Sequence, residues 1–436
     1  MKKVILAFIY LILAIPCPAR TITVDDNAPA DFNNIQAAIG DANDGDTIIV
    51  ADGRYTGQGN RDINFLGKVI TLQSENGPEN CIIDCNGTYE ENHRGFYFLN
   101  GEIANSILDG FTITKGYVVV ICKGGAGVYL DNSSPTIRNC IIKGNVAELD
   151  PYSLCFCYGG GIYVGKGSRP TITTCMINGN SVGKYGLGGG ICCYYDSSTT
   201  IRNCIISNNT ATTPYDTAGM GGGIYCDYYT TLTMVNCTIA ENTASFDGGG
   251  IFFEPPQDRR DIKIINSIIW DNSPNQIATY GSSKAWVIFC DVQGGCLWYP
   301  TNMDENPLFG NPANEDYHLK SRVGRWNPNQ NEWVTDANTS PCIDSGTFTY
   351  WTEELWPHGK RTNMGAYGGT SQASMSPLDI GNIADFNNDD NVDLADMKLF
   401  TYQWLCGEVL LPEDINRNGF VDFDDFATFA DNWPWP

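Results

Sequence analysis

The sequence predicts an all-β solenoid with a helical N-terminal cap, followed by a small all-α domain. Two recurring motifs predict the solenoid. An Asn-Cys-Ile element and a glycine triplet alternate along the chain, each returning about every 25 to 35 residues. A duplicated acidic segment near the C-terminus predicts the second domain. Short repeats of this kind cannot bury their apolar side alone, whereas stacked copies can, because each strand pairs with its counterpart above and below.

Residues 188–211 show one repeat. A glycine triplet precedes a short apolar strand with Ile191, a polar turn follows, and two more strands flank Asn203-Cys204 before an Asn-rich turn. Insertions between copies fall before the glycines, as expected for variable loops on one face of a solenoid. The Asn-Cys-Ile copies are Asn80-Cys81-Ile82, Asn105-Ser106-Ile107, Asn139-Cys140-Ile141, Thr174-Cys175-Met176, Asn203-Cys204-Ile205, Asn236-Cys237-Thr238 and Asn266-Ser267-Ile268. The glycine copies are residues 125–127, 159–161, 188–190, 221–223 and 248–250.

This repeat resembles the right-handed parallel β-helix of the pectin-lyase-like superfamily. The resemblance covers residues 22–300 and extends more loosely to residue 370. It implies the fold, but it does not imply one activity, because a single fold hosts many functions.

The N-terminal part divides into a targeting segment and a cap. Residues 1–19 have two lysines before a short apolar run, which is typical of a secretory signal peptide, and lipidation at Cys17 is the alternative. Residues 20–115 are predicted to hold the cap and the first rungs. Asp31 is the expected N-cap of a short amphipathic helix, which would plug the open end of the solenoid. Its apolar stripe is Phe32, Ile35, Ala38 and Ile39.

Regular rungs are predicted for residues 116–300, and irregular last rungs with a closing cap for 301–370. Residues 371–378 are predicted as a linker before a domain at 379–436. The tryptophans of the cap are expected in its core, with a sugar platform as the alternative: Trp326, Trp333, Trp351 and Trp356. The asparagines of the repeat are expected to stack their amides along a ladder: Asn139, Asn203, Asn236 and Asn266.

The cysteines of the repeat share one rung position: Cys140, Cys175, Cys204 and Cys237. We expect a stack of small buried thiols there, and disulfide links between rungs are the alternative. The formal net charge of −24 argues against nucleic acid, which requires a basic surface. No stretch after the signal segment is predicted to span a membrane. The chain is therefore expected to be secreted, and to act extracellularly or at the cell surface.

Two segments of the C-terminal domain match a twelve-position calcium loop, 29 residues apart. Oxygen-bearing residues fall at positions 1, 3, 5, 9 and 12, and position 7 supplies a main-chain carbonyl, as a hard cation requires. The first loop has Asp385, Asn387, Asp389, Asn391, Asp393 and Asp396 at these positions. The second has Asp414, Asn416, Asn418, Phe420, Asp422 and Asp425. Position 6 of the first loop is Asp390 in place of glycine, and aspartate tolerates the left-handed conformation at some cost.

This duplicated loop-helix segment resembles a type I dockerin. The resemblance implies two Ca²⁺ sites and docking of residues 379–436 to a cohesin-like protein. The positions that dockerins use for partner choice, 10 and 11, hold Leu394-Ala395 and Phe423-Asp424 instead of the familiar Ser/Thr pair. A solvated acidic tail is the alternative interpretation.

An active site is harder to identify in the sequence than the calcium loops are. The Gly-His-Gly element of polygalacturonases of this fold is absent from the sequence. Alternation along the strand after each glycine triplet instead points an aromatic stripe outward, with acids two residues further on. An extended glycan fits such a groove, although loops that cover the stripe as a satellite core are an equal alternative. The predicted substrate-binding residues are Tyr129, Asp131, Tyr163, Tyr225 and Phe252.

Asp227 and Glu254 lie one rung apart in this stripe and are the candidate catalytic pair. The strand spacing would bring their carboxyls about 5 Å apart, which suits a retaining glycosidase. A second calcium site and two solvated acids are the alternatives. Two functions follow from the sequence. The first is a polysaccharide lyase or hydrolase carried to an assembly by its dockerin-like module. The second is a non-catalytic surface or adhesion protein that this module anchors.

Overall fold

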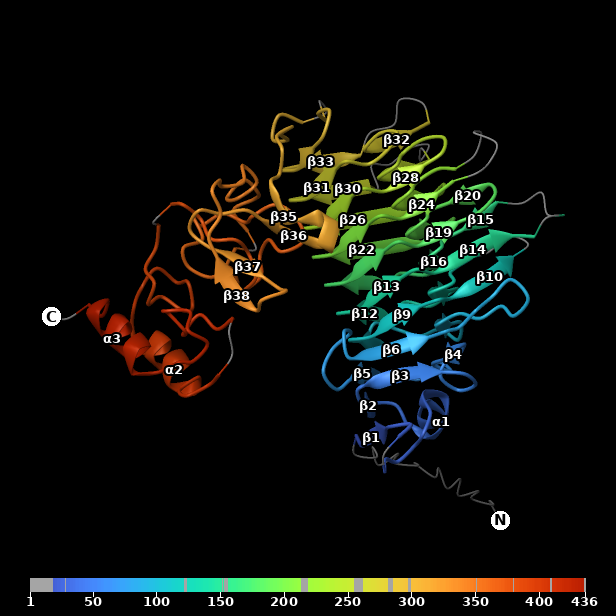
Figure 1. The fold of residues 1–436 in the computed structure, drawn as a ribbon, viewed down its shortest axis with the longest axis horizontal. Coiled ribbons are helices and arrows are strands. Elements are labelled where there is room, and N and C mark those ends of the chain that lie inside the picture. The colour runs from blue at the N-terminus through green and yellow to red at the C-terminus, as the bar shows by residue number, and fades with distance from the viewer. Residues whose placement is uncertain are drawn as a thin grey trace, which may run out of the picture.

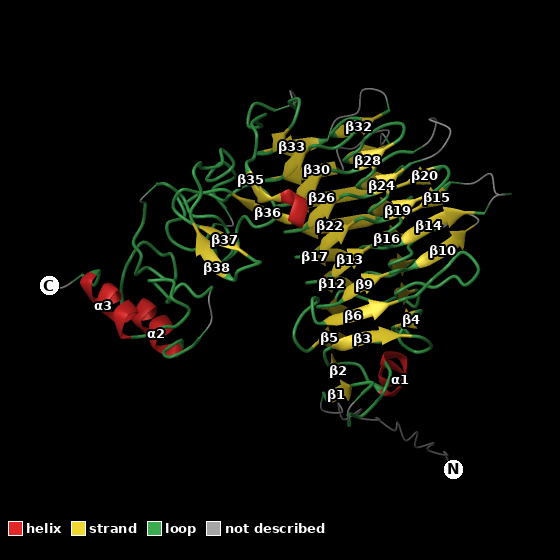
Figure 2. Cartoon of the chain, in the orientation of Figure 1, coloured by secondary structure: helices red, strands yellow, loops and turns green. Residues whose placement is uncertain are grey.

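The computed structural model describes residues 19–27, 29–120, 124–150, 152, 156–212, 219–254, 262–280, 285–296, 299–349, 351–378, 380–407 and 410–434. The predicted signal segment therefore lies outside the described residues, apart from Ala19. Most of the described chain is a parallel β-solenoid. It begins at β1 near the N-terminus, and each further turn of the chain adds one rung (Figure 1). Figure 2 shows that strands dominate this part, whereas helices occur at its N-terminal end, in one short turn after its last rung and near the C-terminus of the chain.

Three long parallel sheets form the sides of the solenoid, as the three-strand repeat predicts. Sheet A contains β1 (Thr21–Val24), β2 (Thr47–Val50), β5 (Thr71–Ser74), β8 (Ile107–Asp109), β12 (Thr136–Arg138), β17 (Thr171–Thr173), β22 (Ser198–Arg202), β26 (Thr231–Val235), β30 (Ile262–Ile265) and β33 (Trp286–Ile288). Sheet B contains β3 (Gly53–Thr56), β6 (Cys81–Asp84), β9 (Thr112–Thr114), β13 (Ile141–Lys143), β18 (Met176–Asn178), β23 (Ile205–Ser207), β27 (Thr238–Ala240), β31 (Ile268–Trp270) and β34 (Asp291–Val292).

Sheet C follows the glycine triplets. It contains β4 (Ile63–Asn64), β7 (Phe96–Phe98), β11 (Val128–Leu130), β16 (Ile162–Val164), β21 (Ile191–Cys193), β25 (Ile224–Cys226), β29 (Ile251–Phe253) and β32 (Ile277–Thr279). A shorter sheet D contains β10 (Tyr117–Val120), β14 (Val146–Leu149), β19 (Ser181–Val182), β24 (Thr210–Ala211) and β28 (Thr243–Ala244). The paired strands β15 (Cys157–Tyr158) and β20 (Gly186–Leu187) belong to the insertions.

The N-terminal cap is the predicted helix, but its N-cap is a different residue. Helix α1 (Ile35–Asp41) begins after Asn34, whose side chain accepts a hydrogen bond from the N–H of Ala37. Asp31 accepts hydrogen bonds from the main chain and hydroxyl of Thr23 instead. Both Asp and Asn make good caps, so the sequence pattern alone did not separate them. The stripe of Ile35, Ala38 and Ile39 is fully buried against the first rungs.

Two asparagine columns run along the solenoid, and the stacked one is not the one predicted. Asn139, Asn203, Asn236 and Asn266 sit at turns with φ near +50°, where asparagine is favoured over most residues. The amide ladder lies on the far side of sheet B, at Asn145, Asn180, Asn209, Asn242 and Asn272. Each amide of this ladder donates to the Oδ1 of the next, over 2.9 or 3.0 Å. The repeat therefore contains a structural amide ladder that its Asn-Cys-Ile element does not mark.

The cysteine stack agrees with the thiol prediction. Cys140, Cys175, Cys204 and Cys237 are buried and are free thiols in the structure. The main-chain N–H of Cys140 donates to Sγ of Cys175 over 3.5 Å, and that of Cys175 donates to Cys204 over 3.4 Å. These small side chains fill the corner between sheets A and B.

The C-terminal cap contains β35 (Phe309–Asn311), the 3₁₀ turn η1 (Pro312–Asn314), β36 (Asp316–Leu319), β37 (Arg325–Asn327) and β38 (Glu332–Val334). Trp326 is buried and packs edge-on against Trp333, as a cap core requires. Residues 371–378, predicted as a linker, contribute buried side chains to the cap, among them Ala373 and Ser376.

The C-terminal module consists of two loops and the helices α2 (Leu394–Tyr402) and α3 (Phe423–Asp431). Phe400 and Phe429 stack at 5.5 Å between ring centroids and form its core together with Val392 and Val421. The first loop contacts the cap, because Asn388 lies 3.0 Å from Nε2 of His358 and donates to the carbonyl of Thr352. Figure 1 shows the module beyond the cap, away from the stacked sheets.

Candidate functional site

A groove runs along the outer face of sheet B. Its two connected parts have volumes of about 380 and 490 Å³ and share Glu79 and Ile141. We call it the sheet-B groove. Its floor consists of side chains that stack in register on successive strands: Ile82, Thr112, Ile141, Met176 and Ile205. Because each rung adds one position to this floor, the groove follows the axis of the solenoid.

One wall of the groove is a segment of the C-terminal cap. Residues 363–372, here called the strap, fold back along sheets A and B. Nδ2 of Asn203 donates to the carbonyls of Ala366 and Gly368, and Nδ2 of Asn236 also contacts that of Gly368. The N–H of Ala366 donates to Oγ1 of Thr238 over 3.0 Å. The strap therefore covers the rungs of Asn203, Asn236 and Asn266 and leaves earlier rungs uncovered.

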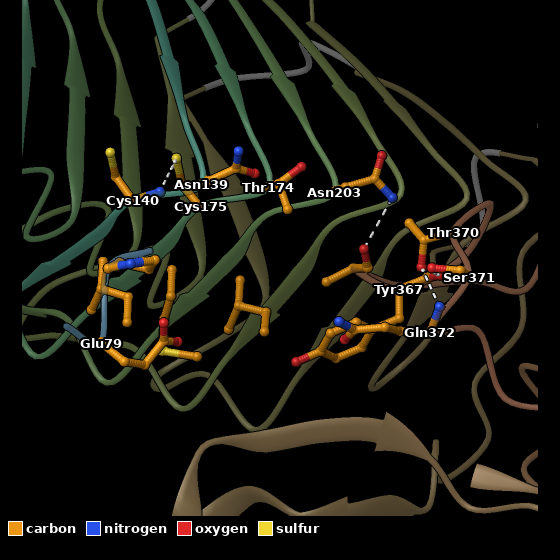
Figure 3. Close-up of a pocket in the computed structure, with 15 residues that line it drawn as sticks. Glu79, Asn139, Cys140, Thr174, Cys175, Asn203, Tyr367, Thr370, Ser371 and Gln372 are labelled. Carbon is orange, nitrogen blue, oxygen red and sulfur yellow. Dashed lines mark hydrogen bonds between the residues drawn. The ribbon is translucent and has the colours of Figure 1, made fainter. Parts of the chain in front are cut away.

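Figure 3 shows where this coverage ends. Tyr367, Thr370, Ser371 and Gln372 line one side of the groove, and Glu79 lies toward the other end. Asn139 and Thr174 occupy the same rung position as Asn203 but are exposed, whereas Asn203 is half-buried. Tyr367 is held by His318, whose ring stacks on it with centroids 3.5 Å apart. Nδ1 of His318 in turn lies 2.7 Å from Oδ1 of Asp316, and this contact fixes the ring on which Tyr367 stacks.

The other end of the groove is charged. Asp84 lies between Arg54 and Lys115, at 2.7 and 2.8 Å. Burial opposes the ionisation of this carboxyl, yet the two cationic partners hold its pKa below the ordinary value. Lys143 is exposed on the next strand. This end offers hydrogen-bond donors of positive charge in a protein that is strongly acidic overall.

The predicted aromatic stripe on sheet C is in the expected register but is not open to a ligand. Tyr129 pairs with Tyr163, and Tyr225 with Phe252, on successive strands. Tyr163 and Phe252 are fully buried, and Tyr225 is nearly so. Insertion residues such as Leu187 and Met220 cover them as a second apolar cluster. The alternative of a satellite core is therefore what the structure contains. Leu187 and Met220 each stand directly before a glycine triplet and pair in register, but the sequence pattern alone does not show that they fold over the stripe.

The acids beside this stripe differ in their burial. Asp131 and Asp227 are half-buried. Glu254 is 8% exposed, and its Oε1 accepts a hydrogen bond of 3.1 Å from the hydroxyl of Tyr225. Burial raises the pKa of Glu254, and the charge of Asp227 adds to the increase. Burial also raises the pKa of Asp227. The two residues follow the paired strands β25 and β29 on neighbouring rungs, and the predicted close approach of their carboxyls stays a prediction.

The two C-terminal loops have the same conformation. Asp385 accepts hydrogen bonds from the N–H groups of Asp389 and Asp390, and Asp414 accepts them from Asn418 and Gly419. Position 6 is left-handed in both loops, with φ of +71° at Asp390 and +91° at Gly419. The first value confirms that aspartate adopts the conformation usually left to glycine.

Positions 9 and 12 build the start of each helix. Asp393 and Asp422 are the N-caps, and each forms a capping box with Asp396 or Asp425 three residues later. Asp396, Asp414 and Asp425 are fully buried. Asp389 and Asn391 of the first loop are exposed, as are Asn418 and Phe420 of the second. The identical hydrogen bonds make this a true duplication.

The donor chemistry of the loops fits Ca²⁺. Burial raises the pKa of Asp385, and the charges of Asp396 and Asp389 add to the increase. The pKa of Asp414 is raised in the same way, by burial and by the charge of Asp425. A cation would relieve this repulsion. Within the described part of the chain, no three Asp, Glu, His or Cys side chains are grouped to hold a metal ion. The predicted sites draw in addition on Asn387 and Asn416 and on main-chain carbonyls.

Comparison with known proteins agrees with the solenoid. Residues 295–346 match the family described as "Disaggregatase related". Among solved structures, the alginate lyase from Paenibacillus sp. strain FPU-7 is 14% identical, with a TM-score of 0.25, covering 62% of this chain and 99% of that one. No curated protein matches the sequence. No helix in the described ranges is long and apolar enough to cross a membrane. Residues 108–292 match the family model "Right handed beta helix region", so this part of the chain is similar to right-handed β-helix regions.

Proposed function

We propose that this chain is a secreted β-helix protein that binds or degrades an extracellular polysaccharide in the sheet-B groove. The observation that carries the proposal is the strap itself. It is a segment of bends and turns that already lies across the outer face of sheet B, where the side-chain amides of Asn203 and Asn236 donate to its carbonyls. On the two preceding rungs Asn139 and Thr174 are exposed at the same position, and Nδ2 of Asn139 donates one hydrogen bond to Oδ1 of Asp109. An extended glycan, rich in hydroxyl groups, can take up these donors as the strap carbonyls do.

The groove also offers the apolar surface that sugar rings need. Ile141 and Met176 are half-buried on its floor, and Tyr367 stands at its wall. Ligand sites usually combine such an apolar lining with a few fixed polar groups. The sheet-C pair of Asp227 and Glu254 lies on a different face and is kept as a separate candidate for catalysis. The buried aromatic stripe takes no part in binding in this proposal.

The C-terminal module is proposed to bind two Ca²⁺ ions and to dock a cohesin-like partner. Asp385, Asn387, Asp389, Asn391, Asp393 and Asp396 would hold the first ion, and their counterparts from Asp414 to Asp425 the second. When bound, Ca²⁺ supplies charge compensation for the buried carboxylates. Leu394 and Phe423, the position 10 residues of the two repeats, are 73% and 74% exposed. Two apolar side chains on the outer face of a small module are what a partner surface requires.

A binding experiment tests the groove. The mature protein is assayed against a panel of plant and algal polysaccharides, with and without calcium, by affinity electrophoresis and by release of reducing ends. Met176→Arg places a long charged side chain on the groove floor and should weaken binding at least tenfold. Thr171→Arg makes the same change on the outer face of sheet A and should leave binding unchanged. Equal affinity in both variants would remove the groove as the site.

A non-catalytic surface or adhesion protein is the second candidate. The burial of Tyr163 and Phe252 favours it, because long insertions then serve to cover one face of the solenoid instead of opening a cleft. Its prediction is the opposite result in the same experiment. This candidate would be established if the protein neither binds nor cleaves any polysaccharide of the panel but attaches to a protein partner in the presence of calcium.

A further inference from the structure

Two carboxyl groups in the C-terminal cap each have one buried oxygen without a hydrogen-bond partner among the described residues. Glu354 is 3% exposed. Its Oε1 accepts hydrogen bonds from the N–H groups of Asn363 and Gly369, over 2.8 and 2.7 Å. Its Oε2 is buried and has no hydrogen-bond partner among the described residues. A buried oxygen of this kind is costly unless another group is bound to it.

Asp344 has the same deficit. Its Oδ2 accepts a hydrogen bond from the hydroxyl of Ser376, whereas its Oδ1 is buried and lacks a partner among the described residues. Asn363 links the two acids, because its N–H donates to Glu354 while its Oδ1 accepts from the N–H of Asp344 over 2.8 Å. The carboxyl of Asp344 also lies so close to Gly359 that a Cβ there would approach its atoms to 2.4 Å. The backbone therefore holds both acids in place.

The charges around this pair do not balance. Burial raises the pKa of Glu354 well above its ordinary value, and the charge of Asp344 contributes. Burial also raises the pKa of Asp344, while Arg361 acts in the opposite direction. The guanidinium of Arg361 donates its hydrogen bonds to the carbonyls of Ser345 and Gly346, not to either carboxyl. Arg361, the cationic side chain whose charge acts on Asp344, is thus bonded to main-chain carbonyls instead of to either acid.

We propose that Asp344 and Glu354 form a buried site for a divalent cation, with Ca²⁺ as the ion. Carboxylate oxygens and main-chain carbonyls are the ligands of hard cations, and Ca²⁺ accepts six to eight of them in flexible geometry, with water filling the remainder. The site is separate from the two C-terminal loops and stabilises the fold of the cap. It ties the segment after β38 to the strap, because Asn363 and Gly369 both belong to the strap and both bind Glu354.

The test uses the full chain with both C-terminal loops disabled by Asp385→Asn and Asp414→Asn. After treatment with a chelator and desalting, calcium alone is titrated in by calorimetry, and the melting temperature of the β-helix is followed. We expect one Ca²⁺ per chain and an increase of several degrees in melting temperature. Adding Glu354→Gln should abolish both effects. Adding Glu102→Gln, which alters a buried glutamate whose oxygens already have donors, should preserve the stoichiometry.

A second variant covers the case in which Glu354→Gln does not fold. Asp344 has a φ of +55°, which asparagine tolerates well, so Asp344→Asn should fold and should likewise lose the ion. No calcium uptake by the loop-disabled chain would overturn the proposal. So would full uptake in Glu354→Gln or Asp344→Asn. A Glu354→Gln chain that is more stable than its parent and indifferent to calcium would show that a proton, not a cation, neutralises the pair.

Discussion

The thiol of Cys342 in the cap donates a hydrogen bond to Oδ2 of Asp291, the first residue of β34, over 3.1 Å. This contact joins the last rung of the solenoid to the cap that closes it. Asp291 is fully buried and also accepts a hydrogen bond from the N–H of Glu305. Burial raises the pKa of Asp291 to about 6. The closing contact is therefore expected to respond to pH near neutrality.

The sign of this pH dependence follows from linkage. The folded pKa lies above the unfolded value of 3.8, so the contribution to stability is complete below pH 4 and is lost as pH rises through about 6. The difference amounts to about 3 kcal/mol. Asp291→Asn should therefore unfold at higher denaturant concentration than the wild type at pH 7.5, and at nearly the same concentration at pH 4. An equal shift at both pH values would contradict the prediction.

The strap offers a prediction with a matched control. Asn203→Ala removes two hydrogen bonds to the strap carbonyls, whereas Asn139→Ala removes one, to the exposed side of Asp109. Asn203→Ala should therefore lower the free energy of unfolding by about 1 kcal/mol more than Asn139→Ala does. Both residues have φ near +50°, so the backbone cost of alanine is the same and cancels in the comparison. Denaturant unfolding measures the difference. Asn139→Ala should in turn weaken glycan binding, because Asn139 lines the open part of the groove.

How far the sequence predicts this structure depends on whether a residue acts inside its own rung. Counterparts of Ile191 and Cys204 recur on neighbouring rungs, so their burial and register follow from the pattern alone. The sheet-B groove does not follow from the repeat pattern, because Tyr367 reaches it from a segment more than a hundred residues away in the sequence. The burial of Tyr163 likewise depends on how residues at the ends of the insertions, such as Leu187, fold over it. Local repetition is readable in one sequence, whereas long-range packing by irregular segments is not.

The interior amide ladder leads to a stability prediction. Asn209 donates to the carbonyl of Ile177 and to Oδ1 of Asn242, and its own Oδ1 accepts from Asn180. Asn209→Ala leaves several buried groups unpaired at once and should cost at least about 3 kcal/mol. Asn208→Ala, at the exposed neighbouring turn, is the control and should cost much less. Similar unfolding midpoints for the two variants would show that the ladder contributes little.

The calcium loops lead to a prediction on folding of the module. Asp385→Ala together with Asp414→Ala removes position 1 from both loops, and with it the acceptor of two N–H groups in each. Helices α2 and α3 should then be lost, because the remaining buried carboxylates stay uncompensated. The loss is measured as a drop in helical circular dichroism and in calcium uptake by calorimetry. Unchanged uptake in the double variant would exclude these loops as the binding sites.

The last prediction concerns Asp227 and Glu254. Both carboxyls have raised pKa values, chiefly through burial, and a raised pKa keeps part of the population protonated, as a general acid must be. If the pair is catalytic, cleavage should fall as pH rises past the raised pKa of the acid. Glu254→Gln retains the oxygen that accepts from Tyr225, so its melting temperature should remain near that of the wild type or rise slightly at neutral pH. The same variant, and Asp227→Asn, should lose at least a hundredfold in rate. Full activity in both variants would exclude the pair, and it would leave the sheet-B groove as the place to search for the catalytic groups.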